Sequence, residues 1–155
     1  MEFKSYTLNL AQFNIAEAKL DDDSPEMQEF FSNVERINAA ADRHPGFVWR
    51  LTDAYGNASS SIRPFSSEFI LVNMSVWKDR ESLFDYVYKS EHLEIYKRKK
   101  EWFRKMPKMH MVMWYVEEGH IPTLDEGMER LDYLNEHGET PHAFTFKSNF
   151  KPVED

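Results

Sequence analysis

Apolar residues occupy both faces of the most regular predicted strand in this chain, the stretch 69–77 with the sequence FILVNMSVW. Because strand side chains alternate between the two faces of a sheet, each face needs its own apolar cover. We expect helices to cover the face that carries Val72, and a partner subunit to cover the other face. This second face also holds two small polar residues among apolar ones, as a small-molecule pocket does. Its members are Phe69, Leu71, Asn73, Ser75 and Trp77.

The same alternation predicts four strands in all, bounded by turn residues or by the start of a helix. They span residues 6–16, 47–51, 69–77 and 109–116. The first and the last of them are also apolar on both faces. The segment 53–68 is rich in Gly, Asn and Ser, so we expect it to form a long hairpin loop.

Helical spacing of apolar residues, together with capping residues, predicts three helical segments. They run from residue 23 or 24 to the turn at 44–46, from 79 to 103, and from 123 to 138. Within the second segment, Ser90 is expected to cap a continuation that carries Leu93 to Phe103. Asp79 is expected to cap the second segment, and the capping box from Thr123 to Glu126 opens the third, which Gly138 closes. The stretch 141–147 is expected to be an extended tail with Phe144 and Phe146 docked.

In chain order the elements are strand, helix, strand, strand, helix and strand, followed by an additional C-terminal helix. This is the split βαβ order of a ferredoxin-like α+β sheet, whose helices cover one face. Apolar residues left on the other face form an association surface. Two sheets stacked in this way make a dimeric α/β barrel, so we predict a homodimer. At 155 residues the chain fits one domain, 1–155, whose C-terminal helix and tail begin at about residue 123.

Composition excludes several classes of function. The net charge of −8 argues against a nucleic-acid partner, which needs a basic surface. The absence of cysteine excludes thiolate nucleophiles and sulfur-ligated metals, and the six histidines show no HExxH spacing, so no metal site is expected. No stretch approaches the ~18 apolar residues that a membrane span needs, so we expect a cytoplasmic protein without a membrane partner. The basic run 97–100 is expected to be a solvated helix face, while Arg50 and Arg98 are the cations expected to point inward.

Six sequence blocks together resemble one known family. The blocks are LAQFNIA, PGFVWRL, LVNMSVW, YKSEHLEIYKRKKEWF, GHIPTLDEGMERL and PHAFTF, and they span nearly the whole chain. The chain is similar to a bacterial family of unknown function within the dimeric α/β-barrel superfamily, the superfamily of the antibiotic-biosynthesis monooxygenases. The resemblance implies the barrel and the dimer, and it implies no established reaction.

Several monooxygenases of this superfamily need no cofactor and act on aromatic substrates that pocket side chains orient. One expectation is therefore a small-molecule-binding protein with a cofactor-independent, monooxygenase-like activity on a small apolar or aromatic substrate. His92 is the expected catalytic acid or base, because histidine titrates near neutrality and an unbroken helix would place it beside two tyrosines. The substrate-binding candidates are Asn14, Asn73, Trp77, Tyr88, Tyr96 and Trp114. The face of strand 109–116 that lines the cavity is left open.

Two alternatives to this enzyme remain. In the first, the protein is a non-catalytic dimeric binding or structural protein, Asn14 and Asn73 bond to neighbouring backbone, and His92 packs at the helix junction. In the second, the protein binds or degrades haem, as one branch of the superfamily does with a His ligand on the second helix. Tyr96 or Lys97 stands where that ligand would be, so no haem cofactor is expected.

Overall fold

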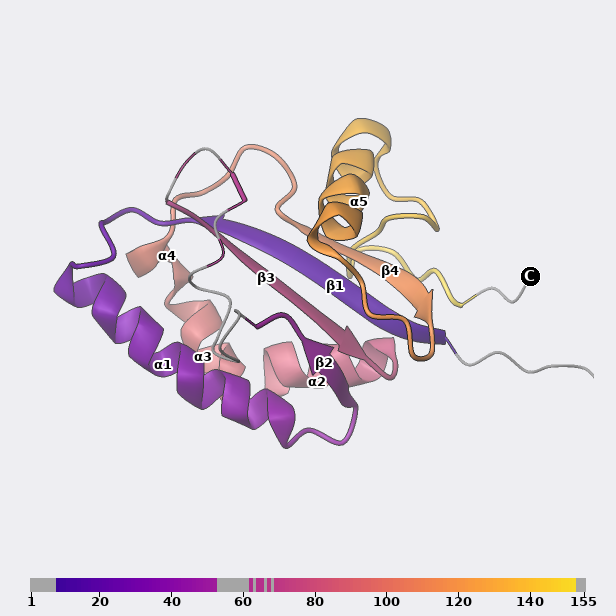
Figure 1. Cartoon of the computed structure of the whole chain (residues 1–155), viewed down its shortest axis with the longest axis horizontal. Helices are drawn as coiled ribbons and strands as arrows, with labels where there is room; N and C mark the ends of the chain where they lie inside the picture. Colours follow the sequence, from indigo (N-terminus) through magenta and orange to yellow (C-terminus); the bar gives the residue numbers. More distant parts are fainter. Residues whose placement is uncertain (1–7, 53–61, 63, 66, 68, 153–155) are drawn as a thin grey trace, which may run out of the picture.

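The computed structural model describes residues 8–52, 62, 64, 65, 67 and 69–152. Residues 6 and 7 of the first predicted strand, and most of the predicted loop 53–68, lie outside these described residues. Four antiparallel strands form one sheet in the order β2-β3-β1-β4, and the sheet is not closed into a barrel within the chain (Figure 1). The predicted α+β class is confirmed. The strands are β1 Leu8–Glu17, β2 Phe47–Arg50, β3 Ile70–Trp77 and β4 Met111–Glu117.

The three longest helices begin at side chains that accept otherwise unpaired backbone N–H groups. Ser24 accepts such a bond at 3.2 Å, Asp79 at 2.8 Å and Thr123 at 3.1 Å, each from the residue three positions further on. These are the caps that the sequence predicts. The helices are α1 Pro25–Asp42, α2 Arg80–Lys89, α3 His92–Lys97, α4 Lys99–Trp102 and α5 Leu124–His137.

The long helical segment predicted after residue 79 is broken twice. Ser90 has extended backbone, with φ −112° and ψ −174°, and ends α2, while Arg98 separates α3 from α4. The Ser90 hydroxyl donates to the carbonyl of Tyr86 and accepts the backbone N–H of His92 at 3.2 Å. Because the break changes the helical phase, residues of α2 and α3 do not continue one stripe.

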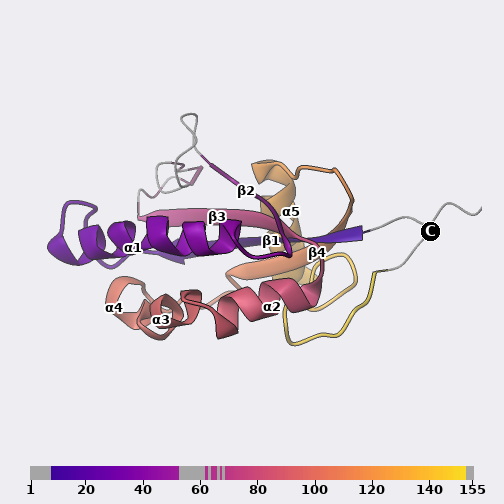
Figure 2. The ribbon, with the colours of Figure 1, turned by 90° about the horizontal axis from the view of Figure 1, so that it is seen from below.

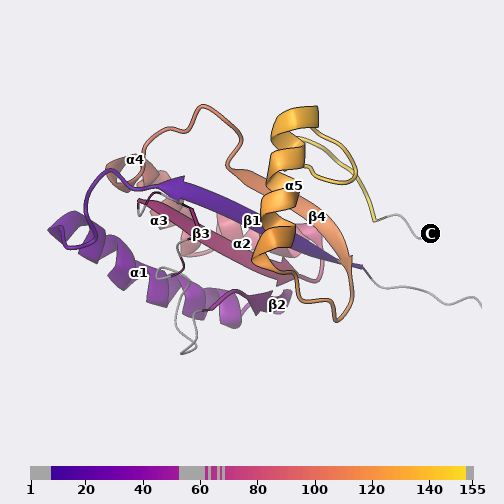
Figure 3. The same ribbon diagram turned by 45° about the horizontal axis from the view of Figure 1, so that its top comes forward.

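Helices lie on both sides of the sheet. Figure 2 shows α2, α3 and α4 on one side and α5 on the opposite side. In Figure 3, α5 crosses β1 and β4, while α1 runs beside the half of the sheet formed by β3 and β2. The added C-terminal helix is therefore an intramolecular cover for the sheet face that α2 to α4 leave open.

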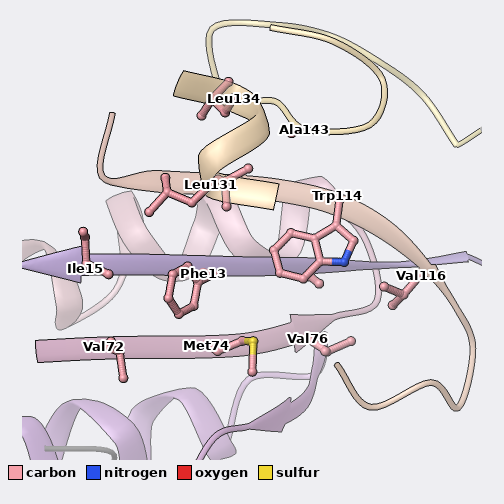
Figure 4. Packing of buried hydrophobic residues seen from close by; sticks show 12 residues of the cluster. Phe13, Ile15, Val72, Met74, Val76, Trp114, Val116, Leu131, Leu134 and Ala143 are labelled. Carbon is pink, nitrogen blue, oxygen red and sulfur yellow. The ribbon is translucent and has the colours of Figure 1, made fainter. Parts of the chain in front are cut away.

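The face under α5 is a closed apolar core (Figure 4). Phe13, Met74 and Trp114 from three neighbouring strands are fully buried there beneath Leu131 and Leu134 of α5. The helix can approach closely because residue 127 is glycine. A Cβ at Gly127 would lie 2.9 Å from the Phe13 ring and 3.2 Å from the sulfur of Met74.

The predicted assignment of the two faces of β3 was wrong. Leu71 and Trp77 were expected on the face that the helices leave open, but both are buried under the helical layer formed by α1, α2 and α4. The face that carries Val72 is the one under α5. Strand alternation correctly separates the side chains of β3 into two sets. It cannot predict which set lies under α1 to α4, since both sets are apolar. The burial of both faces within one chain removes the reason for which a partner subunit was predicted.

Two apolar clusters lie between the sheet and this helical layer. The Trp77 cluster comprises Leu10, Ile37, Ala41, Trp77, Leu83, Tyr86, Met113 and Phe144. The Trp102 cluster comprises Ala18, Met27, Leu71 and Trp102. Ile95 of α3 packs against both clusters, so α3 bridges the space between them.

The C-terminal tail completes the outer edge of the sheet. Phe144 is fully buried and pairs with Met113 of β4 through reciprocal backbone bonds of 2.7 Å and 3.0 Å. The Tyr115 hydroxyl donates to the carbonyl of Phe150 at 2.8 Å. The docking of Phe144 predicted from the sequence is therefore confirmed. Among the helices of the described residues, none has the length and apolar character that crossing a membrane requires.

Candidate functional site

Four polar side chains lie on the two central strands, on the side of the sheet that α1 to α4 cover. They lie between the two apolar clusters of that side. Strand register places Gln12 opposite Ser75, and Asn14 opposite Asn73. Because opposite residues of an antiparallel pair project to the same face, the four side chains form one continuous polar patch. We call this group, Gln12, Asn14, Asn73 and Ser75, the polar patch.

Hydrogen bonds fix the orientation of three of these side chains. The amide nitrogen of Gln12 donates to Asn73 Oδ1 at 2.7 Å and to Ser75 Oγ at 2.8 Å. The indole nitrogen of Trp77 also donates to Ser75 Oγ, at 2.8 Å. Both amide hydrogens of Gln12 are thereby used. Its amide oxygen is left to face another partner.

Several amide atoms of the polar patch remain without a partner. The amide oxygen of Gln12, the amide nitrogen of Asn73 and both amide atoms of Asn14 make no hydrogen bond within the described part of the chain. Within the described residues, the fully buried side-chain nitrogen and oxygen atoms without a partner all belong to arginines. The unpaired amide atoms of the polar patch are therefore not fully buried. The polar patch thus has unpaired donors and acceptors on the side of the sheet that α1 to α4 cover.

An aromatic pair forms the wall of the site toward α2. Tyr86 stacks on Trp77 with ring centroids 4.9 Å apart and an interplanar angle of 27°. Its hydroxyl donates to the carbonyl of Ile37 in α1 at 3.1 Å. Burial raises the pKa of Tyr86, so its hydroxyl stays protonated near neutrality. Tyr86 therefore joins β3, α2 and α1 at the edge of the polar patch.

His92 lies beside this pair at the start of α3. Its ring is 5.0 Å from that of Tyr86, and its Nδ1 is 3.2 Å from the carbonyl oxygen of Val87. Since a carbonyl only accepts, Nδ1 carries the hydrogen in the neutral ring, and Nε2 is left with a free lone pair. Burial lowers the pKa of His92, while the bond to Val87 opposes part of this shift. His92 is therefore a neutral base at physiological pH.

The structure does not bring the other predicted site residues to the polar patch. Tyr88 and Tyr96 contact each other at 5.6 Å on the outer side of α2 and α3, and Lys99 Nζ lies 4.1 Å above the Tyr96 ring. Burial raises the pKa of Tyr88. Trp114 lies on the opposite face, where its indole nitrogen donates to Glu126 at 2.8 Å. The predicted residues that come together are Asn14, Asn73 and Trp77. His92 is joined to them through Tyr86.

Register also settles which face of the last strand adjoins the site. Met111 and Met113 pair with Asn14 and Gln12, so the set that includes Tyr115 faces α1 to α4, whereas Trp114 faces α5.

Tyr86 was not among the site residues predicted from the sequence. Leu83 and Tyr86 are the buried residues of α2, and Phe84 is 40 % exposed. The three-residue spacing from Leu83 to Tyr86 is the signal that points to Tyr86.

Other charged groups lie outside the polar patch. Arg98 points outward and binds Glu29 and Glu101, each at 2.7 Å, whereas Arg50 lies on the helix-facing side, as predicted. Within the described residues, no group of three or more His, Asp or Glu could hold a metal. Two shallow surface hollows lie on the outer side of α5 and contain none of these site residues, so hydrogen-bond geometry, and not surface shape, locates the candidate site.

The fold and site together define an α+β protein with one antiparallel sheet and a polar patch beneath its helical layer. Residues 9–155 match the family model described as a domain of unknown function, DUF3291, and the chain belongs to this family. The family of unknown function predicted from the sequence blocks is thereby confirmed. No curated protein matches the chain.

Solved structures share the fold at low sequence identity. A conserved protein from Methanosarcina mazei Go1 is 17 % identical with a TM-score of 0.50, and the match covers 70 % of this chain and 92 % of that one. SnoaB, a cofactor-independent oxygenase from Streptomyces nogalater, is 18 % identical with a TM-score of 0.46, and the match covers 76 % of this chain and 98 % of SnoaB.

Proposed function

We propose that this protein binds a small apolar or aromatic molecule against the polar patch, beneath α1 to α3, and oxidises it as a cofactor-independent monooxygenase. One observation carries the proposal. Amide atoms of Gln12, Asn14 and Asn73 lack partners in a region flanked by two apolar clusters. These amide atoms are not fully buried, so they are open to a bound molecule. A ligand with a polar edge and an apolar body satisfies both the amides and the clusters.

Each part of the arrangement has a role in this chemistry. Trp77 and Tyr86 supply the apolar surface, and Asn14 and Asn73 orient the polar edge of the substrate. Nε2 of His92 accepts a proton from an activated CH₂ group, which gives a carbanion that reacts with O₂. One oxygen atom then replaces the two hydrogens as a carbonyl, and the other leaves with them as water. The substrate supplies all four electrons.

Dithranol, a hydroxyaromatic ketone with such a CH₂ group, provides a direct test. We expect the protein to consume one O₂ for each anthraquinone formed, faster than the reaction without protein. His92→Gln should lower kcat/KM by about 100-fold, the usual range for loss of a general base. Trp114→Phe, on the opposite face, is the matched control and should leave kcat/KM unchanged. No turnover of dithranol or of related hydroxyaromatic ketones would contradict the catalytic part.

A non-catalytic binding protein is the second candidate, and a specific observation favours it. Gln12, Asn73, Ser75 and Trp77 bond to one another, so this network stabilises the sheet without any reaction. The backbone N–H of His92 bonds to Ser90, as expected of a residue that only packs at the helix junction. Saturable binding of dithranol without O₂ consumption would support this candidate.

We also propose a cytoplasmic homodimer, as the sequence predicted. Both sheet faces are covered within the chain, so the interface would use apolar residues that remain exposed. Phe84 and Tyr96, which are 40 % and 37 % exposed on the outer side of α2 and α3, are the best candidates.

A further inference from the structure

Arg50 lies at the margin of the polar patch. It is the last residue of β2 and pairs with Ser75 of β3, so its side chain starts from the helix-facing side. From there it reaches α1, where Nη1 donates to the carbonyl of Asn38 at 3.2 Å and pairs with the carboxylate of Asp42. The Arg50 side chain is 20 % exposed. One of its terminal nitrogens is thus anchored, and the guanidinium plane is held in place.

The other edge of this guanidinium has no partner among the residues that the structure describes. Nε of Arg50 is buried without a hydrogen bond, and Nη2 makes none to the described residues. These two nitrogens carry parallel N–H bonds, which is the fork that binds the two oxygens of a carboxylate. A buried N–H without an acceptor is unfavourable, so a ligand that supplies one is favoured here.

Arg98 of the same chain shows what this edge binds when an acceptor is present. Its Nε donates to Glu101 Oε2 at 2.7 Å and its Nη2 donates to Glu101 Oε1 at 3.1 Å. Among the described residues, the corresponding edge of Arg50 binds no carboxylate, because Asp42 is engaged by Nη1 and the polar patch contains only amides and a hydroxyl. The charge of Arg50 reaches the site, since it lowers the pKa of Tyr86 against the larger, opposite effect of burial.

We propose that the Nε and Nη2 edge of Arg50 binds a carboxylate of the ligand, so that the ligand is an apolar or aromatic carboxylate. This inference rests on the proposed binding site at the polar patch. The amides of Asn14 and Asn73 then contact the part of the ligand between its carboxylate and its apolar body. Recognition of a carboxylate by Arg50 requires no change in the bonds that Arg50 makes to α1.

Naphthoate and its neutral amide, naphthamide, distinguish a carboxylate site from a merely apolar one. We expect calorimetry to show naphthoate binding at least 10-fold more tightly than naphthamide, and Arg50→Gln to abolish this preference. Arg98→Gln is the matched control and should preserve the preference, because the fork of Arg98 is already occupied. Asp42→Asn should tighten naphthoate binding and leave naphthamide binding unchanged, since it removes the negative charge that partly neutralises Arg50.

The outcomes separate the two proposals. Equal binding of naphthoate and naphthamide at the polar patch, unaffected by Arg50→Gln, would overturn the carboxylate inference and leave the proposed binding site in place. Binding of neither probe, nor of dithranol, would overturn the binding site and the inference with it. If Arg50→Gln does not fold, Asp42→Asn tests the carboxylate inference. Weaker or unchanged naphthoate binding in that variant would contradict it.

Discussion

Tyr86 stacks on Trp77 with ring centroids 4.9 Å apart, and through this contact α2 is held against the central strand β3. The stack adds about 0.5–1.5 kcal/mol beyond the burial of the two rings. Because the hydroxyl of Tyr86 also donates to Ile37 of α1, one side chain ties three elements together around the polar patch. The position of the helical layer above the candidate site therefore depends on Tyr86.

Tyr86→Phe should lower the free energy of unfolding by about 1 kcal/mol, because it removes the bond to Ile37 and keeps the ring. Tyr86→Ala should lower it by about 3–5 kcal/mol, because it removes the stack as well and leaves a cavity. Urea denaturation monitored by circular dichroism measures both values. Equal losses in the two variants would mean that the ring contributes nothing, which contradicts the described stack.

Leu71→Asp should destabilise the folded chain by at least about 3 kcal/mol, because Leu71 is 8 % exposed and packs in the Trp102 cluster under the helices. Leu20→Asp is the matched control, since Leu20 is 38 % exposed, and should change stability by less than about 0.5 kcal/mol. Denaturation and sedimentation together check the result. A Leu71→Asp protein of normal stability that fails only to self-associate would restore the original assignment of the faces.

Local patterns predicted the elements well, because each depends on neighbours in sequence. Ser24, Asp79 and Thr123 cap the helices that they were expected to cap, and the four strands lie where alternation placed them. The faces could not be predicted, because the sets on both sides of β3 are apolar and only the position of α5 distinguishes them.

The candidate site was only partly predictable for a related reason. Asn14 and Asn73 share a face by strand alternation, so their proximity follows from register. The direction of the side chains on α2 and α3 depends on the helical phase, which changes at the break at Ser90. As a result His92 lies beside Tyr86, while Tyr88 points outward. Ser90 was expected to cap a continuation of the helix, but a capping residue does not fix the direction in which the next helix runs.

Stability should fall in acid partly because of His92. Its pKa in the folded state is lowered from 6.5 by burial, so below that pH the unfolded chain binds a proton that the folded chain does not. The free energy of unfolding should therefore decrease as pH falls from 6.5 toward the lower pKa of the folded state. His92→Gln should remove this part of the slope, as denaturation across this pH range would show. An identical slope in both proteins would mean that His92 is not desolvated.

Gly127→Ala should destabilise the protein by about 1–3 kcal/mol, although alanine is the better helix former, because the added methyl would contact Phe13 and Met74. At an unconstrained helix position the same change stabilises by about 0.5–1 kcal/mol, so the sign of the effect is diagnostic. Asp132→Ala on the exposed side of α5 is the control. A stabilised Gly127→Ala protein would show that α5 does not pack closely on the sheet.

The central claim is that a ligand binds to the polar patch, and the side-chain amide signals of asparagine in an NMR titration test it most directly. On addition of dithranol, the account predicts that the signals of Asn14 and Asn73 shift together and saturate. Those of Asn33 and Asn135 should not move, because Asn33 bonds to the carbonyl of Glu29 in α1 and Asn135 bonds to the carbonyl of Met109, both in exposed positions. Saturable shifts confined to residues around Phe84 and Tyr96, with Asn14 and Asn73 unchanged, would contradict the account.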